Sequence, residues 1–322
     1  MRSLQHFTPN RDGWHLALQQ SWADDALRPD SYPVLIVPGY GMNSFIFGYH
    51  PRGTSLESAL VDGGLEVWRV DLRAQGESRS IGGTDEYGLT DLAVTDLGAA
   101  IDAVLERTRT RARKVAIIGA SLGGSLMFGH AALVQNHKIG LMVAVGAPVR
   151  WVKINPLLRI AFGSPTLAGL VRFKGTRQLA GAALPYVLRH TPWLLSIYMN
   201  PRYVDQSALE QLVQTVEDPN RHVNREIAQW IRDGDLVMRG VNVARSLKQV
   251  TQPLLSIVAR ADGIVPPETA GFAHTEVASA DRQLVEVGHE DLRLAHADMF
   301  ISDHALAQVF APIRDFIVAR PI

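Results

Sequence analysis

One serine, set among glycines between an apolar run and a helical pattern, constrains this chain more than any other feature. The stretch is KVAIIGASLGGSLMFGHAAL, residues 114–133, and its centre reads Gly-Ala-Ser-Leu-Gly around Ser121. The apolar run predicts a buried strand, and the residues after the serine predict a helix. A sharp strand-to-helix turn lifts the central hydroxyl off the backbone and requires small neighbouring residues. The pattern therefore predicts a serine nucleophile; the alternative is a glycine-rich connection with an incidental serine.

The rest of the chain alternates strand patterns with helix patterns. Strands are predicted in YPVLIVPGYG, LEVWRVDLRAQGES, KVAIIG, IGLMVAVGAP, PLLSIVARADG and QLVEVG, and helices in LTDLAVTDLGAAIDAVLERT, SLGGSLMFGHAAL and HALAQVFAPIRDFIVA. This alternation predicts an α/β fold with a mostly parallel central sheet covered by helices on both faces. The early segment GWHLALQQSW alternates in polarity and predicts an antiparallel edge strand.

The alternation of strands and helices is interrupted once, between two of the predicted strands. Residues 150–251 lack strand-like runs, and Leu, Ala, Arg and Gln dominate there among recurring prolines. We interpret this stretch as several short helices. The chain is therefore expected to form one core from residues 1–149 and 252–322, with a helical cap at residues 150–251 inserted between strands of that core.

Composition excludes several classes of function. The chain has no cysteine, so disulfides, thiolate metal sites and a cysteine nucleophile are all excluded. Lysine plus arginine equals aspartate plus glutamate at 32 each, so the net charge gives no reason to expect a nucleic-acid or anionic-membrane partner. The N-terminus has no apolar signal region, and the longest apolar run, IGLMVAVGAPV, is too short to span a bilayer. We expect a cytoplasmic location.

A nucleophilic serine needs a base, usually histidine, and a carboxylate that orients it. Asp262 follows the predicted strand LLSIVAR and precedes the turn GIVPP, which is the position expected for the acid. Two histidines follow the strand QLVEVG, namely His289 and His296. The residues alone do not separate these two candidates. Asp71, after an earlier strand, is expected to brace its loop.

These features resemble the α/β-hydrolase superfamily. The segments SLESALVDGGLEVWRVDLRAQGES and LTDLAVTDLGAAIDAVLER resemble its acid-lipase branch, whereas GASLGGSLMFGHAAL and RADGIVPPETA resemble its poly(hydroxyalkanoate) synthase-like branch. The resemblance fades across residues 150–250. The synthase branch carries cysteine where this chain has Ser121, so the departure favours hydrolysis over polymer synthesis.

The resemblance also assigns the remaining site residues. In acid lipases the catalytic histidine begins a His-x-Asp-Phe-like stretch before the terminal helix, and HADMFISDHALAQVFAPI is similar from His296 without a gap. This implies His296 as the base and His289 as a loop residue near the site mouth. The family pattern further implies an oxyanion hole formed by the backbone N–H groups of Tyr40 and Leu122. Pro38 stands where the family usually has histidine, but the task of that loop belongs to a backbone N–H.

The resemblance and the residues together predict a serine hydrolase that cleaves carboxylic esters through Ser121, His296 and Asp262, with no metal or organic cofactor. An acyltransferase with the same triad is the alternative, and a small-molecule-binding protein on the same scaffold is a third hypothesis. The apolar segments LLRIAFGSPTLAGLV and LPYVLRHTPWLLSIYM of the cap suggest a small hydrophobic ester as substrate; the alternative is that they only pack the cap onto the core. A weaker expectation from the same segments is that the cap contacts a membrane. The oligomeric state is left open.

Overall fold

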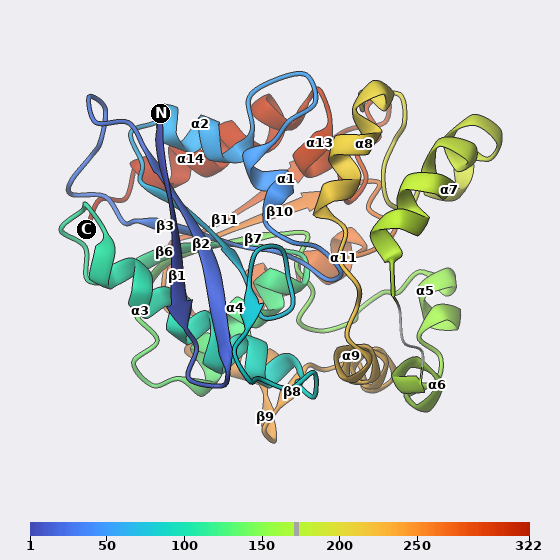
Figure 1. Ribbon diagram of the computed structural model, residues 1–322, viewed down its shortest axis with the longest axis horizontal. Helices are drawn as coiled ribbons and strands as arrows, with labels where there is room; N and C mark the ends of the chain where they lie inside the picture. The colour runs from blue at the N-terminus through green and yellow to red at the C-terminus, as the bar shows by residue number, and fades with distance from the viewer. Residues whose placement is uncertain (171–173) are drawn as a thin grey trace.

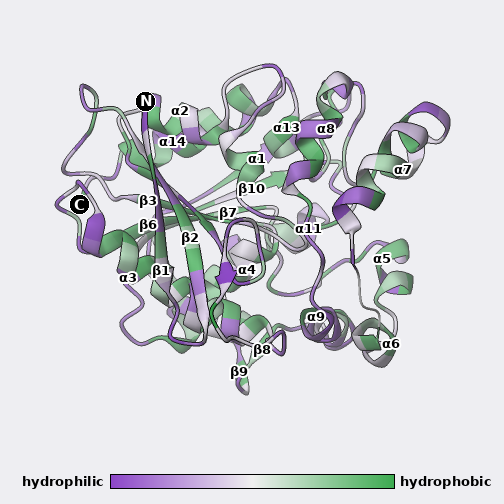
Figure 2. Cartoon of the chain, viewed as in Figure 1, coloured by the Kyte–Doolittle hydropathy of each residue, from purple (hydrophilic) through white to green (hydrophobic). Residues whose placement is uncertain are grey.

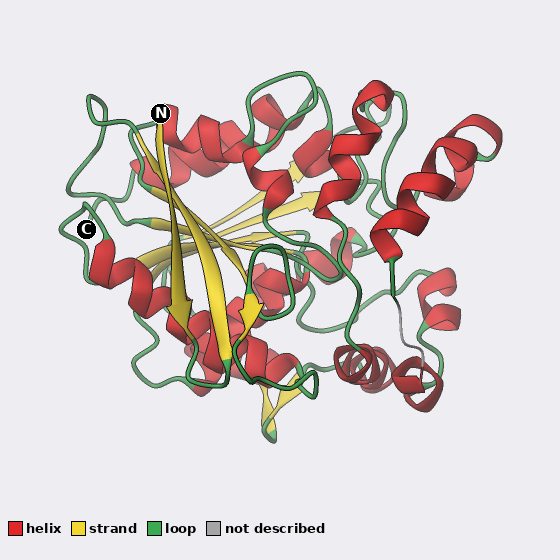
Figure 3. Cartoon of the chain, in the orientation of Figure 1, coloured by secondary structure: helices red, strands yellow, loops and turns green. Residues whose placement is uncertain are grey.

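The computed structural model describes residues 1–170 and 174–322, and a twisted sheet runs through its centre with helices on both sides (Figures 1 and 3). Strand order is β1-β2-β4-β3-β6-β7-β10-β11, and β5 pairs with β2. From β4 to β11 every pairing is parallel, whereas β1 and β2 run antiparallel to their neighbours. The strands are β1 (Arg2–Pro9), β2 (Trp14–Trp22), β3 (Val34–Val37), β4 (Val67–Asp71), β5 (Arg79–Ser80), β6 (Val115–Ala120), β7 (Ile139–Val145), β10 (Leu254–Ala259) and β11 (Arg282–Val287).

The mostly parallel sheet predicted from the sequence is confirmed, and each of the six predicted parallel strands is present. The prediction of an edge position for GWHLALQQSW is wrong, although its antiparallel direction is right. β2 lies second in the sheet, because β1 pairs with it from Arg2↔Trp22 to Pro9↔His15. Most residues of β1 are exposed, so the strand lacks the apolar alternation that would have revealed it.

Side chains of the central strands alternate between two hydrophobic cores. Leu35 and Val37 of β3 pack with one set of helices, and Val34 and Ile36 pack with the other. The strands are correspondingly hydrophobic along their length in Figure 2. The first core includes η1 (Asp91–Asp96), α3 (Leu97–Arg107), α4 (Leu122–Leu133) and α12 (Phe272–Glu276); the second includes α1 (Phe45–Gly48), α2 (Leu56–Asp62), α13 (Asp298–Ile301), η6 (Leu306–Phe310) and α14 (Ala311–Val318). A short helix, α11 (Pro267–Ala270), follows β10.

The chain between β7 and β10 is mainly helical. α5, α6 and α7 lie at the end of the molecule farthest from both termini (Figure 1). α5 and α6 contain no buried residue, whereas α9 buries Val223, Ile227 and Trp230 in the first core. The elements are α5 (Pro156–Ala161), α6 (Pro165–Leu170), α7 (Thr176–His190), η2 (Pro192–Leu195), η3 (Gln206–Ala208), α8 (Leu209–Leu212), η4 (Val213–Thr215), α9 (Arg221–Asp233), β8 (Val237–Met238), β9 (Val241–Asn242), α10 (Val243–Ser246) and η5 (Leu247–Gln249).

The last part of this insertion belongs to the core by its packing. Val243, Ala244 and Leu247 are buried in the first core, and α10 and η5 contact α4. Because α9 is also buried in this core, the extent of the cap, set at residues 150–251 from the sequence, stays a prediction. Within residues 1–170 and 174–322, no helix is both long and apolar enough to cross a bilayer.

Candidate active site

Ser121 occupies the sharp turn between β6 and α4. Its backbone has φ 51° and ψ −120°, a conformation that non-glycine residues rarely adopt. Its N–H donates to the carbonyl of Val145 on the neighbouring strand at 2.8 Å, and its own carbonyl accepts from the N–H of Gly124 at 3.0 Å. These bonds hold the strained turn in place, so the hydroxyl lies at the carboxyl end of the sheet.

The glycines around Ser121 are required by close backbone packing. A Cβ on Gly119 would lie 2.4 Å from Cα of Gly124, and one on Gly123 would lie 2.3 Å from the carbonyl oxygen of Val37. A Cβ on Gly124 would meet Cβ of Ala147 at 2.4 Å. Such contacts are well inside van der Waals separation. Because these three positions are glycine, α4 can approach β3, β6 and the end of β7 closely enough to form the turn.

The carboxylate of Asp262 and the imidazole of His296 form a buried pair beside this turn. Asp262 Oδ2 lies 2.6 Å from His296 Nδ1. The other oxygen, Oδ1, accepts from the backbone N–H groups of Ile264 and Val265, each at 2.8 Å. The exposed fraction is 10% for the His296 side chain and 1% for the Asp262 side chain. The loop after β10 thus fixes the carboxylate, and the carboxylate fixes the ring.

The His296 ring lies against the backbone at the end of β7. Gly146 has φ +56°, and a Cβ there would lie 3.1 Å from His296 Cε1. His296 and Ser121 line the same two cavities. Among the described residues, the Ser121 hydroxyl has no hydrogen-bond partner. Hydrogen bonds at catalytic sites are commonly long or misaligned without substrate.

His289 lies elsewhere, on an exposed turn directly after β11. Its backbone N–H and carbonyl both bond with Leu292, at 2.9 and 3.1 Å. The structure therefore brings His296 to Asp262 and leaves His289 at the surface of the loop between β11 and α13.

The loop after β3 carries the second element of the predicted oxyanion hole. A Cβ on Gly39 would lie 3.1 Å from Cβ of Ser121, so this loop runs directly beside the serine. In the part of the chain that the structure describes, neither the Tyr40 N–H nor the Leu122 N–H has a hydrogen-bond partner. Both donors are therefore available to an oxygen atom near Ser121.

The inserted helices hold the Tyr40 loop. The Tyr40 hydroxyl donates to Asn224 Oδ1 on α9 at 2.6 Å, and burial raises the pKa of this phenol. The N–H of Asn43 donates to the carbonyl of Thr215 at 2.9 Å, and the N–H of Glu217 donates to Gly41 at 2.9 Å. Sequence reasoning missed these contacts, because residues so far apart along the chain carry no pattern that links them.

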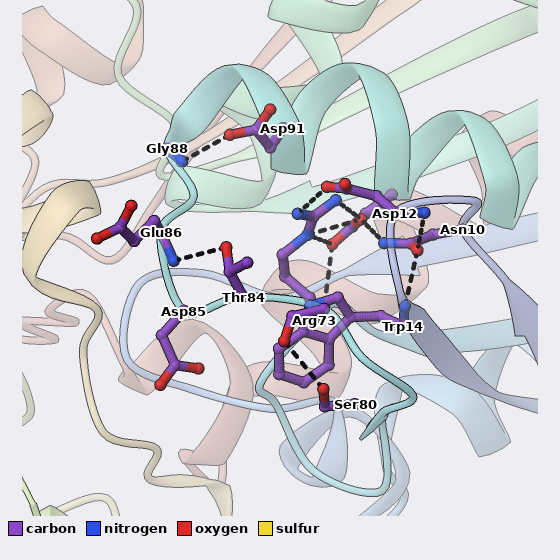
Figure 4. Close-up of polar contacts among 12 residues, drawn as sticks. Asn10, Asp12, Trp14, Arg73, Ser80, Thr84, Asp85, Glu86, Gly88 and Asp91 are labelled. Carbon is purple, nitrogen blue, oxygen red and sulfur yellow. Dashed lines mark hydrogen bonds and ion pairs between the residues drawn. The ribbon is translucent and has the colours of Figure 1, made fainter.

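A polar cluster supports the loops behind this site. Asp71 accepts from the N–H of Ser44 at 2.8 Å and from the N–H of Glu77 at 3.0 Å, as expected for a bracing residue. Beyond it, Arg73 is buried and its guanidinium binds Asp96 and Asp12. Figure 4 shows Arg73 between Asp12 and the loop that leads to Asp91. A buried pair of this kind fixes loop geometry more than it adds stability.

Asp298 is a second buried carboxylate near the base; it lies in the His-x-Asp-Phe-like stretch, but the sequence analysis assigned it no role. Its side chain accepts from the N–H of Ala295 at 2.8 Å and from the N–H of Asn200 at 2.9 Å. Burial raises the pKa of Asp298 to about 6, and the charge of Asp262 adds to this shift. Asp298 therefore ties the turn before His296 to the inserted segment. Its signal in the sequence is an acid two residues after the candidate base, within an apolar stretch.

Two apolar cavities meet at Ser121 and His296. One, of about 310 Å³, has mainly aliphatic walls that include Leu184 and Val187 of α7. The other, of about 300 Å³ and here called the aromatic cavity, combines aliphatic side chains with the rings of Tyr40, Trp151, Phe162, Tyr198 and Trp230. An apolar pocket with a few convergent polar groups is the usual form of a small-molecule site. No cluster of metal-ligating side chains occurs within residues 1–170 and 174–322.

Comparison with known proteins agrees with this architecture. The model of the Alpha/beta hydrolase family matches residues 34–309, so the chain belongs to this family. This family is broader than the acid-lipase and poly(hydroxyalkanoate) synthase-like branches, and the narrower resemblance stays a prediction. No curated protein matches the chain.

Several solved structures share the fold. An esterase from Exiguobacterium antarcticum has 16% identity and a TM-score of 0.61 over 98% of this chain and 99% of its own. A meta-cleavage product hydrolase from Pseudomonas fluorescens IP01 has 15% identity and a TM-score of 0.64 over 97% and 96%. A serine hydrolase involved in carbazole degradation has 18% identity and a TM-score of 0.64 over 99% and 100%. At these identities the likeness concerns the fold.

Proposed function

We propose that this member of the family is a serine hydrolase that cleaves carboxylic esters, with Ser121 as nucleophile, His296 as base and Asp262 as its orienting acid. One observation carries the proposal. A histidine held by a buried carboxylate at 2.6 Å shares both cavities with a serine on a strained strand-to-helix turn. A serine hydroxyl becomes nucleophilic when such a base accepts its proton.

In the proposed reaction the Ser121 Oγ attacks the ester carbonyl while His296 Nε2 takes its proton. The carboxylate of Asp262 keeps the remaining proton on Nδ1 and stabilises the imidazolium. The N–H groups of Tyr40 and Leu122 bind the oxyanion, and losing one such donor typically slows turnover about 10²–10³-fold. His296 then protonates the departing alcohol. Water attacks the acyl-enzyme with the same base, which releases the acid and restores the serine.

The two cavities support a hydrophobic ester as substrate. The aliphatic and aromatic cavities both reach Ser121, so the acyl group and the alcohol each have an apolar compartment. His296 lies where the two cavities meet. Among the described residues that line them, it is the only titratable side chain with a carboxylate partner, Asp262. An ester with apolar groups on both sides of its carbonyl fits this arrangement best.

Two measurements test the proposed function. A fluorophosphonate should label Ser121 in the wild type and should fail to label Ser121→Ala, whereas a binding protein would give no label in either. Turnover of p-nitrophenyl esters should rise with acyl chain length from acetate until the cavity is filled and then fall. Highest activity on acetate, or a flat profile, would contradict a hydrophobic substrate while leaving the nucleophile in place.

A further inference from the structure

The charges of this chain are distributed very unevenly. Residues 150–204 contain eight lysines and arginines and no aspartate or glutamate, although the whole chain has 32 of each kind. This segment therefore carries +8, and the rest of the chain carries −8. Glu106 is the last acid before it, and Asp205 is the first after it. Acids make up about one residue in ten of the chain, so a stretch of this length without any is a marked bias.

The same segment exposes an unusual number of large apolar side chains. Seven of them on α5, α6, α7 and η2 are between 56% and 78% exposed: Leu157, Ile160, Leu167, Leu170, Leu179, Tyr186 and Trp193. Leu179 and Tyr186 are seven residues apart and thus lie on one face of α7. Other positions of α7, among them Leu184 and Val187, line the aliphatic cavity. Single exposed apolar residues are ordinary, but a cluster at one end of a molecule marks an interaction surface.

Several cations of this segment lack a partner. Arg159 on α5, Lys174 before α7 and Arg189 on α7 form no ion pair with any residue of 1–170 or 174–322. In contrast, Lys153 and Arg177 pair with Glu268 and Glu217. The unpaired cations lie between the exposed apolar residues in the sequence. α5, α6 and α7 all lie at one end of the long axis of the molecule (Figure 1).

We propose that this end of the molecule, formed by α5, α6, α7 and η2, docks on the surface of an anionic lipid bilayer. Basic residues beside exposed Leu, Ile, Tyr and Trp are the composition that binds at the headgroup level, because cations meet anionic headgroups while apolar and aromatic groups enter the boundary below. A second copy of the chain is disfavoured as occupant, since it would bring the unpaired cations of two copies together. The contact is peripheral, because no described helix can span a bilayer.

Docking in this orientation would place the outer face of α7 in lipid and its inner face over the aliphatic cavity. The docking itself is independent of the proposed esterase chemistry, because none of the seven exposed apolar residues lines a cavity that contains Ser121.

The test is binding of the full chain to vesicles of phosphatidylcholine containing about 30 mol% phosphatidylserine, compared with phosphatidylcholine alone. Trp193 is 69% exposed, so its emission should shift to the blue on binding. We expect binding to the anionic vesicles at least about tenfold tighter than to neutral ones, and a loss of that difference in about 0.5 M salt. Arg189→Glu should weaken binding about tenfold or more, because each cation near the surface contributes about a fivefold factor.

The control is Arg113→Glu, which makes the same charge change at an exposed cation before β6, at the opposite end of that strand from Ser121. It should bind like the wild type. Equal weakening by both variants would mean that only net charge matters, and it would overturn the proposal. Equal binding to both kinds of vesicle, or no binding to either, would also overturn it. Concentration-dependent dimers that Trp193→Ala abolishes, without vesicle binding, would assign the surface to a second copy instead. Each outcome is read without an ester substrate and stands whether or not Ser121 hydrolyses one.

Discussion

The turn that carries Ser121 and the helices α5 to α7 are built in opposite ways. The first nine residues of α4, from Leu122 to His130, are buried, and its backbone lies so close to β3 and β6 that only glycine fits at three positions. α5 and α6 bury no residue, and α7 buries only Leu188. Catalysis needs atoms fixed within a few tenths of an ångström, which the packed region supplies. The hydrophobic substrate that we propose needs wall area and access, which the loosely packed helices supply.

The largest effect should come from the packed region. Ser121→Ala removes one oxygen atom and should lower ester turnover by at least about 10⁴-fold, because members of a triad act as a unit. The melting temperature should stay within about 2 °C of the wild type, because alanine keeps the Cβ of the serine and with it the backbone strain of the turn. Steady-state kinetics and calorimetry on the same preparation check both halves. Turnover within about tenfold of the wild type would show that the serine is not the nucleophile.

A pair of matched glycine substitutions tests the packing contrast itself. Gly123→Ala places a methyl group 2.3 Å from the carbonyl oxygen of Val37 and should cost at least about 3 kcal/mol of unfolding free energy. Gly181→Ala in α7 meets nothing closer than 3.9 Å, at Val213 Cγ2, and should be neutral or stabilise by up to about 1 kcal/mol. Denaturant unfolding measures both values. A similar loss in the two variants would remove the contrast.

His130 should make the packed region sensitive to acid. It is 3% exposed in α4, its Nδ1 lies 2.7 Å from the carbonyl oxygen of Ala93, and burial lowers its pKa to about 4. At a pH below 6.5, the usual pKa of histidine, His130 is protonated in the unfolded chain but stays neutral in the folded chain until the pH reaches about 4. Unfolding free energy should therefore fall, by about 3 kcal/mol, as pH drops from about 6.5 to about 4. His130→Gln should flatten that part of the stability profile; an unchanged profile would contradict the assignment.

Asp298 should act in the opposite direction where the two regions meet. Its pKa is raised to about 6 from its usual value near 4, chiefly by burial, so the folded chain holds a proton that the unfolded chain releases. This contribution to stability is present at about pH 4 and is lost as pH rises to about 6. In Asp298→Asn this decline of the unfolding free energy with rising pH should be absent. A difference between wild type and variant that stays constant from about pH 4 to about pH 7 would count against the raised pKa.

Much of the packed region could be predicted from the sequence. Parallel strands covered on both faces need continuous apolar runs, so β3, β6, β7 and β10 are evident from the amino-acid pattern alone. β1 is not evident, because one of its faces is exposed to solvent and its side chains follow no pattern. The inserted helices could be predicted as helices, but their packing could not, since contacts such as that between Tyr40 and Asn224 join distant parts of the chain.

The candidate site likewise contains residues that the sequence pattern predicts and one that it does not. Ser121 and Asp262 are each marked by a preceding strand, which fixes where the side chain emerges. The histidine is not, because His289 and His296 both follow β11 and only the resemblance to acid lipases favours the second. The structure places His296, and not His289, against Asp262. Its role as base stays a prediction.

The most direct test of the account is therefore the rate at which a fluorophosphonate labels Ser121 in three proteins: the wild type, His296→Ala and His289→Ala. The account predicts that His296→Ala labels at least about 10³-fold more slowly than the wild type, because the serine loses the base that accepts its proton. His289→Ala should label within about threefold of the wild type. Slow labelling in His289→Ala together with wild-type labelling in His296→Ala would contradict the central claim, and the base would have to come from the exposed turn after β11.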